Sequence, residues 1–137
     1  MVDACREAVA AARAGLTRAA QSLAASVVDS AVRLVVPQLS SSYYPKVIEK
    51  VSSNEDPYMQ DLREVATYWP VAPALRPFWG HKGDPTPTDF NRHASAHAVG
   101  SEQYTPANAL VALMLATSML REFEEHETTP PAASDRD

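Results

Sequence analysis

Apolar residues recur every three or four positions through the first 36 residues of the chain, and they do so again between Pro106 and Glu125. This spacing places them on one face of a helix. Much of the apolar content is alanine, which loses little side-chain entropy in a helix, whereas glycine occurs only four times. No segment alternates apolar and polar residues as a half-buried strand does. The sequence therefore predicts an all-α fold.

Glycines and prolines divide this pattern into separate helices. Gly15 is expected to break the first run into two helices, and Pro37 to end it. Five prolines and two glycines between Pro70 and Pro87 exclude a long helix and predict a rigid, Pro-rich loop. The whole pattern predicts a helical bundle of four to five main helices, with the later helices over residues 45–51, 57–69, 89–99 and 106–125.

The chain of 137 residues is long enough for one domain with a hydrophobic core and too short for two. We expect this domain over residues 1–126. Residues 127–137 are polar and contain prolines, so we expect a disordered C-terminal tail. Because the chain begins directly inside a helical pattern, it also fits a fragment of a larger protein.

Three general features limit the compartment and the partners. A single cysteine, Cys5, cannot form an internal disulfide, and together with the absence of a signal peptide this favours a cytoplasmic protein. The apolar stretch from Ala107 to Met119 is shorter than the roughly 20 residues of a membrane span, so no membrane association is expected. The net charge of −5 argues against a general nucleic-acid coat but permits a small basic site.

One short segment carries most of the reactive chemistry, the run Asn91-Arg92-His93-Ala94-Ser95-Ala96-His97. A histidine can both accept and donate a proton near neutral pH. An arginine can hold a phosphate through two parallel hydrogen bonds. The two residue types together suit phosphodiester chemistry without a metal.

The same segment resembles the signature of HEPN domains, an arginine followed after four to six residues by a histidine. Arg92 and His97 have this spacing, and His93 supplies the polar residue after the arginine. The run is similar to the "NRH-x-x-x-H" segment of bacterial HEPN-like proteins, in which a "Y-T-x-x-N" turn leads into the last helix. That turn is matched by Tyr104, Thr105 and Asn108, and the detailed likeness covers about 35 residues.

The resemblance implies a small all-α bundle that cleaves RNA without a metal or other cofactor, leaving a cyclic phosphate. The protein would be an endoribonuclease or the nuclease module of a stress or phage-defence system. By this likeness His97 is the general acid and base, Arg92 stabilises the phosphorane charge, and His93 orients or assists. Asn91 and Tyr104 are expected to contact the substrate.

The resemblance also implies partners: a homodimer in which two motifs face one cleft, RNA, and an antitoxin or other protein. Arg92 and His97 are five residues apart, so on a regular helix they point about 140° away from each other. Either the helix is distorted at this point, or a second copy of the chain completes the site.

Two other interpretations of the segment remain open. His93 and His97 share a helix face and could hold a metal with a third ligand, although we predict no metal site; the candidate ligands are His81, Asp84, Asp89 and Glu102. Alternatively, Arg92 pairs with Asp89 or Glu102 and the histidines line a seam of the bundle. The chain would then be a non-catalytic helical dimerisation or interaction domain.

The remaining distinctive side chains are expected to be structural. We predict that Leu75 is buried under the Pro-rich loop and that three aromatic residues belong to the core, with a base-stacking platform as the alternative; these residues are Trp69, Phe78 and Trp79. Scattered basic residues are expected to be solvated charges, with a phosphate-binding rim as the alternative; they are Lys46, Lys50, Arg63 and Arg76. Cys5 is expected to be a small unreactive residue.

Overall fold

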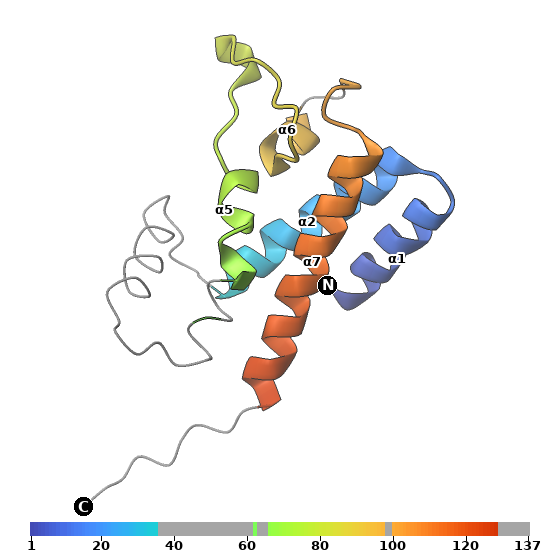
Figure 1. The fold of residues 1–137 in the computed structure, drawn as a ribbon, viewed down its shortest axis with the longest axis vertical. Helices are drawn as coiled ribbons and strands as arrows, with labels where there is room; N and C mark the ends of the chain where they lie inside the picture. The colour runs from blue at the N-terminus through green and yellow to red at the C-terminus, as the bar shows by residue number, and fades with distance from the viewer. Residues whose placement is uncertain (36–61, 63–65, 98–99, 129–137) are drawn as a thin grey trace, which may run out of the picture.

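The computed structural model describes residues 1–35, 62, 66–97 and 100–128. This part of the chain contains helices and no strands, which confirms the all-α prediction. Figure 1 shows three long helices packed together, with the shorter elements to the upper left of them. The elements are α1 (Val2–Arg13), α2 (Thr17–Val35), α5 (Val71–Ala74), the 3₁₀ turn η1 (Gly80–Lys82), α6 (Arg92–His97) and α7 (Pro106–Thr128).

Helix α2 is the centre of the described fold. It packs against α1, α7 and α6, and α1 also contacts α7. The core between these helices consists mainly of small residues, so the helix axes can approach closely. Its buried members include Ala8, Ala24, Val28, Ala31, Val71, Ala112, Leu115, Ala116 and Met119.

The first two helices separate at Gly15, as the sequence predicts. Gly15 has a φ of 74°, a left-handed conformation that disfavours residues with a Cβ. The N–H of Gly15 donates to the carbonyl oxygen of Ala12 at 3.0 Å, and the N–H of Leu16 donates to that of Ala11 at 2.9 Å. These two bonds form a Schellman motif, which satisfies the last carbonyls of α1 and turns the chain back into α2.

Helix α7 also begins as predicted, at Pro106. The hydroxyl of Thr105 accepts a hydrogen bond from the N–H of Asn108 at 3.1 Å, which caps the first turn. The helix continues to Thr128, so the expected start of a disordered tail at residue 127 is two residues too early. Residues 129–137 lie outside the described residues.

The other predicted boundaries are confirmed only in part. Helix α6 begins at Arg92 and not at residue 89, because Asn91 caps it. The helix expected over residues 45–51 lies outside the described part of the chain. Of the one expected over residues 57–69, Leu62 and residues 66–69 are described; Leu62 and residues 66–68 are helical, and Trp69 lies in the turn that follows.

The Pro-rich segment is more structured and more exposed than its composition suggests. It contains α5 and η1, and η1 extends away from the three long helices (Figure 1). Phe78 is buried and Leu75 partly buried, as predicted. The prediction that both tryptophans belong to the core is wrong, because Trp69 is 56% exposed and Trp79 is 45% exposed.

None of the described helices is both long enough and apolar enough to cross a membrane.

Candidate functional site

The candidate site depends on how α6 is fixed to the rest of the fold. Asn91 is buried, and its side-chain oxygen accepts the N–H of Ala94 at 2.8 Å, which caps α6. Its side-chain nitrogen donates to the carbonyl oxygen of Arg76 at 3.0 Å. Both ends of the Asn91 amide are therefore bonded within the chain, and they join the start of α6 to the backbone at Arg76.

A second buried amide, Gln103, joins three segments. Its Nε2 donates to the carbonyl oxygens of Pro87 at 2.8 Å and Asp89 at 2.9 Å. Its Oε1 accepts the backbone N–H of Asn91 at 2.9 Å. Gln21 of α2 donates through Nε2 to the hydroxyl of Ser95 at 2.8 Å and to the carbonyl oxygen of Gln103 at 3.1 Å. This network holds α6 against α2 without a large apolar contact.

An open groove lies between α2 and α6. Its volume is about 520 Å³, and its walls are mostly polar. The helix α2, the helix α6 and the residue Tyr104 contribute its lining, which consists of Ser22, Ala25, Ser26, Asp29, Ser30, Arg92, Ser95, Ala96, His97 and Tyr104. The structure therefore brings Arg92 and His97 to the same solvent-accessible groove, although their separation in sequence places them on different faces of a regular helix.

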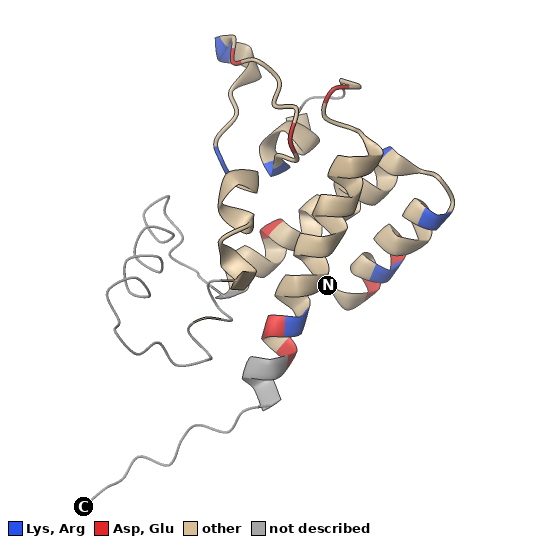
Figure 2. Cartoon of the chain, in the orientation of Figure 1, with Lys and Arg blue, Asp and Glu red and all other residues tan. Residues whose placement is uncertain are grey.

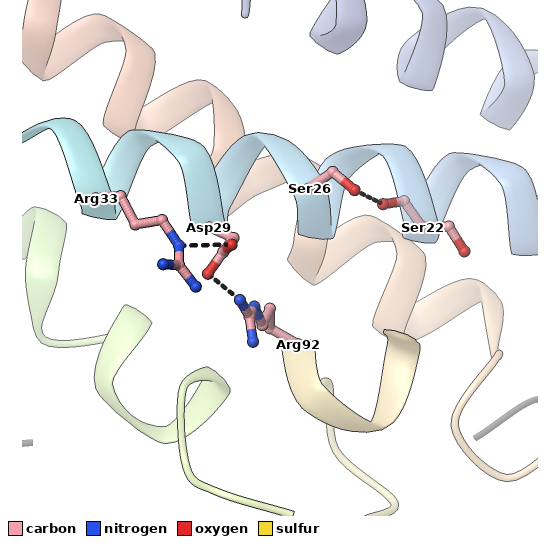
Figure 3. Close-up of polar contacts among 5 residues, drawn as sticks. All are labelled: Ser22, Ser26, Asp29, Arg33 and Arg92. Carbon is pink, nitrogen blue, oxygen red and sulfur yellow. Dashed lines mark hydrogen bonds and ion pairs between the residues drawn. The ribbon is translucent and has the colours of Figure 1, made fainter. Parts of the chain in front are cut away.

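Arg92 forms an ion pair with Asp29 of α2, as Figure 3 shows. The side chains are 17% and 27% exposed, respectively. The other carboxylate oxygen of Asp29 accepts a hydrogen bond from Nε of Arg33 at 3.0 Å, and Arg33 is largely exposed. The predicted alternative partners of Arg92 were Asp89 and Glu102, so the ion pair exists within one chain but with a different acid.

One carboxylate thus faces two guanidinium groups, which leaves this part of the groove with a net positive charge. Burial by itself would raise the pKa of Asp29. The hydrogen bonds from Arg92 and Arg33 outweigh this effect, so the pKa lies below its ordinary value and the carboxylate stays ionised. Asp29 is the only acidic residue in the sequence of α2, and Figure 2 shows how the charges are distributed over the described chain. The local charge suits an anionic ligand even though the chain as a whole is acidic.

The two histidines of α6 occupy different positions. His97 is exposed and lines the groove. His93 is partly buried and does not line the groove. The two rings are close, with centroids 6.1 Å apart. Burial, and then the nearby Arg92 and His97, lower the pKa of His93, which therefore stays neutral at pH 7.

Tyr104 closes one end of the groove. Its hydroxyl donates to the carbonyl oxygen of Ser95 and lies 3.2 Å from the hydroxyl of Ser22. The guanidinium of Arg18 lies 6.0 Å from the centre of its ring. Of the two predicted substrate contacts, Tyr104 therefore reaches the groove and Asn91 does not.

The sequence interpretation missed the contribution of α2 to this site. Ser22, Ser26, Asp29 and Arg33 follow one another at intervals of four, three and four residues, which is the spacing of one helix face. This polar stripe was the available signal. Figure 3 shows its residues along α2, with Ser26 donating to the carbonyl oxygen of Ser22 at 3.0 Å.

Metal binding gains no support from the described residues, among which no three His, Cys, Asp or Glu side chains gather in one place. The third ligand required by His93 and His97 is therefore not supplied within the described ranges.

A larger groove of about 710 Å³ lies between α1 and α7, and its lining is mostly apolar. Cys5 is buried at its base, where burial raises the pKa of the thiol. A thiol held in its protonated form is a poor nucleophile, so the expectation that Cys5 is unreactive agrees with its surroundings. The groove contains no histidine, and the chemistry is concentrated between α2 and α6.

The chain matches no model of a protein family, no curated protein and no solved structure.

Proposed function

We propose that the groove between α2 and α6 binds a phosphodiester of RNA, and that the protein is a HEPN-like endoribonuclease that works without a metal. The observation that carries this proposal is that Arg92 and His97 line one solvent-accessible groove. A guanidinium for the phosphate and an imidazole for proton transfer are the two groups that such a cleavage needs.

Arg92 can serve the phosphate while it remains paired with Asp29. A guanidinium has five N–H donors, and the ion pair with Asp29 engages the Nη2 end. We assign the remaining donors to two oxygens of a phosphate. Asp29 then has the role of holding the guanidinium in a fixed orientation, which reduces the entropy lost on binding. The second arginine on Asp29, Arg33, limits the competition between the carboxylate and an incoming anion.

The cleavage is an internal transfer within the RNA. An imidazole accepts the proton of the ribose 2′-hydroxyl as its oxygen forms a bond to the neighbouring phosphorus. The bond from phosphorus to the 5′-oxygen of the next nucleotide breaks, and that oxygen receives a proton from a second imidazole. The products are a 2′,3′-cyclic phosphate and a 5′-hydroxyl, and neither step requires a cofactor. Arg92 stabilises the additional negative charge on the phosphorus oxygens between these steps.

Two imidazoles are needed, and His97 is the one in the groove. The neutral His93, 6.1 Å away, is a suitable base if the substrate extends over α6. In a homodimer with two facing grooves, a second copy of the chain supplies another imidazole. We favour the dimer, because two facing grooves would bring two copies of Arg92 and two of His97 to one scissile phosphate.

The test is to incubate RNA with the purified protein in excess EDTA and to identify the ends of the products. The wild type is expected to give cyclic phosphate ends, and Arg92→Ala and His97→Ala to give none. Arg6→Ala is the matched control, because Arg6 forms an exposed ion pair with Asp3 on α1 and does not line the groove. Cleavage that persists in both groove variants would contradict the proposal.

A second candidate is a non-catalytic dimerisation domain, and one observation favours it. The pair between Arg92 and Asp29 joins α6 to α2, which is a sufficient structural role for the arginine. In this case the exposed apolar residues on the first turns of α7 are the surface for a second copy; they are Leu110, Val111 and Met114. RNA would remain intact, and Leu110→Glu would convert a dimer into monomers in sedimentation velocity.

A further inference from the structure

Trp79 is held in place by its surroundings while its ring remains in solvent. The preceding residue, Phe78, is buried, and the following turn η1 packs closely on the Phe78 ring. A Cβ added to Gly80 would lie 3.0 Å from that ring, so the glycine permits this close approach. The backbone N–H of Trp79 donates to Oδ2 of Asp84 at 2.8 Å. The segment thus presents an indole ring from a fixed backbone.

The exposed indole lies at one end of a row of rings that reaches the groove. The centroid of Trp79 is 6.3 Å from that of His93, and His93 is 6.1 Å from His97, which lines the groove. The bases of a single strand can be splayed out and stacked one by one on side-chain rings. A strand whose phosphate lies at Arg92 and His97 therefore has a base within reach of Trp79.

The charge around Trp79 suits a nucleic acid as well. Nζ of Lys82 lies 4.8 Å from the centre of the indole ring, a cation–π contact that covers one face and leaves an ammonium group beside the ring. His81 contacts the ring edge, with centroids 5.8 Å apart and planes at 86°. A base can stack on the uncovered indole surface while Lys82 attracts the adjoining phosphate.

We propose that Trp79 is the stacking platform for a nucleobase next to the scissile phosphate, and that the substrate is single-stranded RNA. This inference rests on the proposed function of the groove. A base in a duplex is already stacked and paired, so it cannot occupy an isolated indole without being extruded. An unpaired base can, because every base has an aromatic face; the platform therefore selects for strand state and only weakly for sequence.

The sequence provides a direct readout of this stacking. The chain contains two tryptophans, so Trp69→Phe leaves Trp79 as the only one. The probe is a 2′-O-methyl oligoadenylate of about six nucleotides, within the range of single-strand site sizes. It has no free 2′-hydroxyl and is not cleaved, so binding is measured whether or not the protein is an active nuclease. Anisotropy of a labelled probe measures affinity, and tryptophan fluorescence measures stacking.

Binding of this probe is expected to quench the fluorescence of the Trp69→Phe variant. Trp79→Ala is expected to lose about tenfold in affinity, the scale of one stacked base, and Trp79→Phe to recover most of it. Trp69→Ala is the matched control, because it removes the other exposed tryptophan, which lies outside the row of rings. A blunt 2′-O-methyl RNA duplex, rich in G·C pairs and long enough to stay paired at the assay temperature, is expected to bind more weakly and to leave the fluorescence unchanged.

The outcomes separate this inference from the function on which it rests. If the wild type cleaves RNA but the probe does not quench Trp69→Phe, the platform is overturned and the nuclease is retained. The same holds if the wild type cleaves RNA and Trp79→Ala binds the probe with wild-type affinity. Quenching by the probe without any cleavage of RNA overturns the nuclease and retains the platform. Equal binding of duplex and single strand overturns the proposed substrate class, and absence of any binding overturns the platform. Thermal unfolding of Trp79→Ala at the wild-type temperature excludes a merely structural effect.

Discussion

The guanidinium of Arg92 on α6 is ion-paired with the carboxylate of Asp29 on α2, 63 residues earlier in the chain. The pair is mostly covered by protein, and Arg33 contacts the same carboxylate from the solvent side. The orientation of the guanidinium that we propose as the phosphate-binding group is therefore determined by a residue outside its own sequence motif.

Replacing Asp29 by Asn is expected to destabilise the fold by about 1–3 kcal/mol, because it leaves the partly buried guanidinium of Arg92 without its counter-charge. Urea unfolding measures the effect. Arg33→Ala breaks only the exposed pair on the same carboxylate, and we expect a loss of about 0–0.5 kcal/mol. If the two variants unfold at the same urea concentration, the ion pair with Arg92 contributes no more than a surface contact.

The lowered pKa of His93 predicts that the free energy of unfolding decreases as the pH is lowered. Its folded pKa lies below the ordinary value of 6.5, so the unfolded chain binds more protons as the pH decreases through this range. The free energy of unfolding is therefore expected to be constant above about pH 7 and to decrease below pH 6.5.

His93→Gln should flatten this decrease, whereas His81→Gln, which changes an exposed histidine on η1, should not. The depressed pKa of Asp29 adds a further loss only below its unfolded value of 3.8. The measurement is urea unfolding over about three pH units, from roughly pH 5 to pH 8, which span the ordinary pKa of histidine. An unchanged slope in His93→Gln would contradict the assigned cause.

Arg92→Lys tests whether the groove uses the shape of the guanidinium or only its charge. Lysine retains the positive charge but cannot bind Asp29 and two phosphate oxygens at once. We expect a fall of about 10²–10³ in the cleavage rate, the scale for losing one oriented donor, and a much smaller change in stability. Wild-type cleavage by Arg92→Lys would show that no bidentate contact is made.

Asn91→Asp distinguishes the structural role of this residue from the predicted contact with substrate. Aspartate keeps the oxygen that caps α6 but loses the donor to the carbonyl oxygen of Arg76. We expect a loss of about 1–3 kcal/mol, since the buried side chain at position 91 would then face the carbonyl oxygen of Arg76 without a donor between them. Asn91→Ala removes both bonds and is expected to be less stable still. Full stability with weakened RNA binding would restore the substrate contact.

The sequence predicted the long helices well, because their boundaries depend on local chemistry. Gly15 and the pair Thr105-Pro106 act within one turn of their own positions, and the structure confirms both. The motif residues were harder. The groove has two walls, and α2 contributes Asp29 from a helix that in sequence is only amphipathic. The polar stripe on α2 marks this wall in the sequence, but nothing local indicates that Asp29 faces Arg92, 63 residues later in the chain.

The exposure of Trp79 also could not be read from the sequence. Hydrophobicity predicts that a large aromatic residue is buried, and Phe78 beside it follows this rule. Which of two adjacent aromatic rings faces the core is determined by the direction of the chain between α5 and η1. That direction depends on the contact of Gly80 with Phe78 and on the bond from Trp79 to Asp84, which are tertiary details.

The amide of Gln103 has a consequence for how such a protein can diversify. Its Nε2 donates to the backbone carbonyls of Pro87 and Asp89, which follow η1 in the sequence. These bonds fix the chain just before α6, whatever the length of the loop between Lys82 and Thr86. Insertions or deletions between Lys82 and Thr86 would reposition the indole and leave the reactive helix where it is. In such variants the proposed base contact at Trp79 would change, while Arg92 and His97 of α6 would keep their places in the groove.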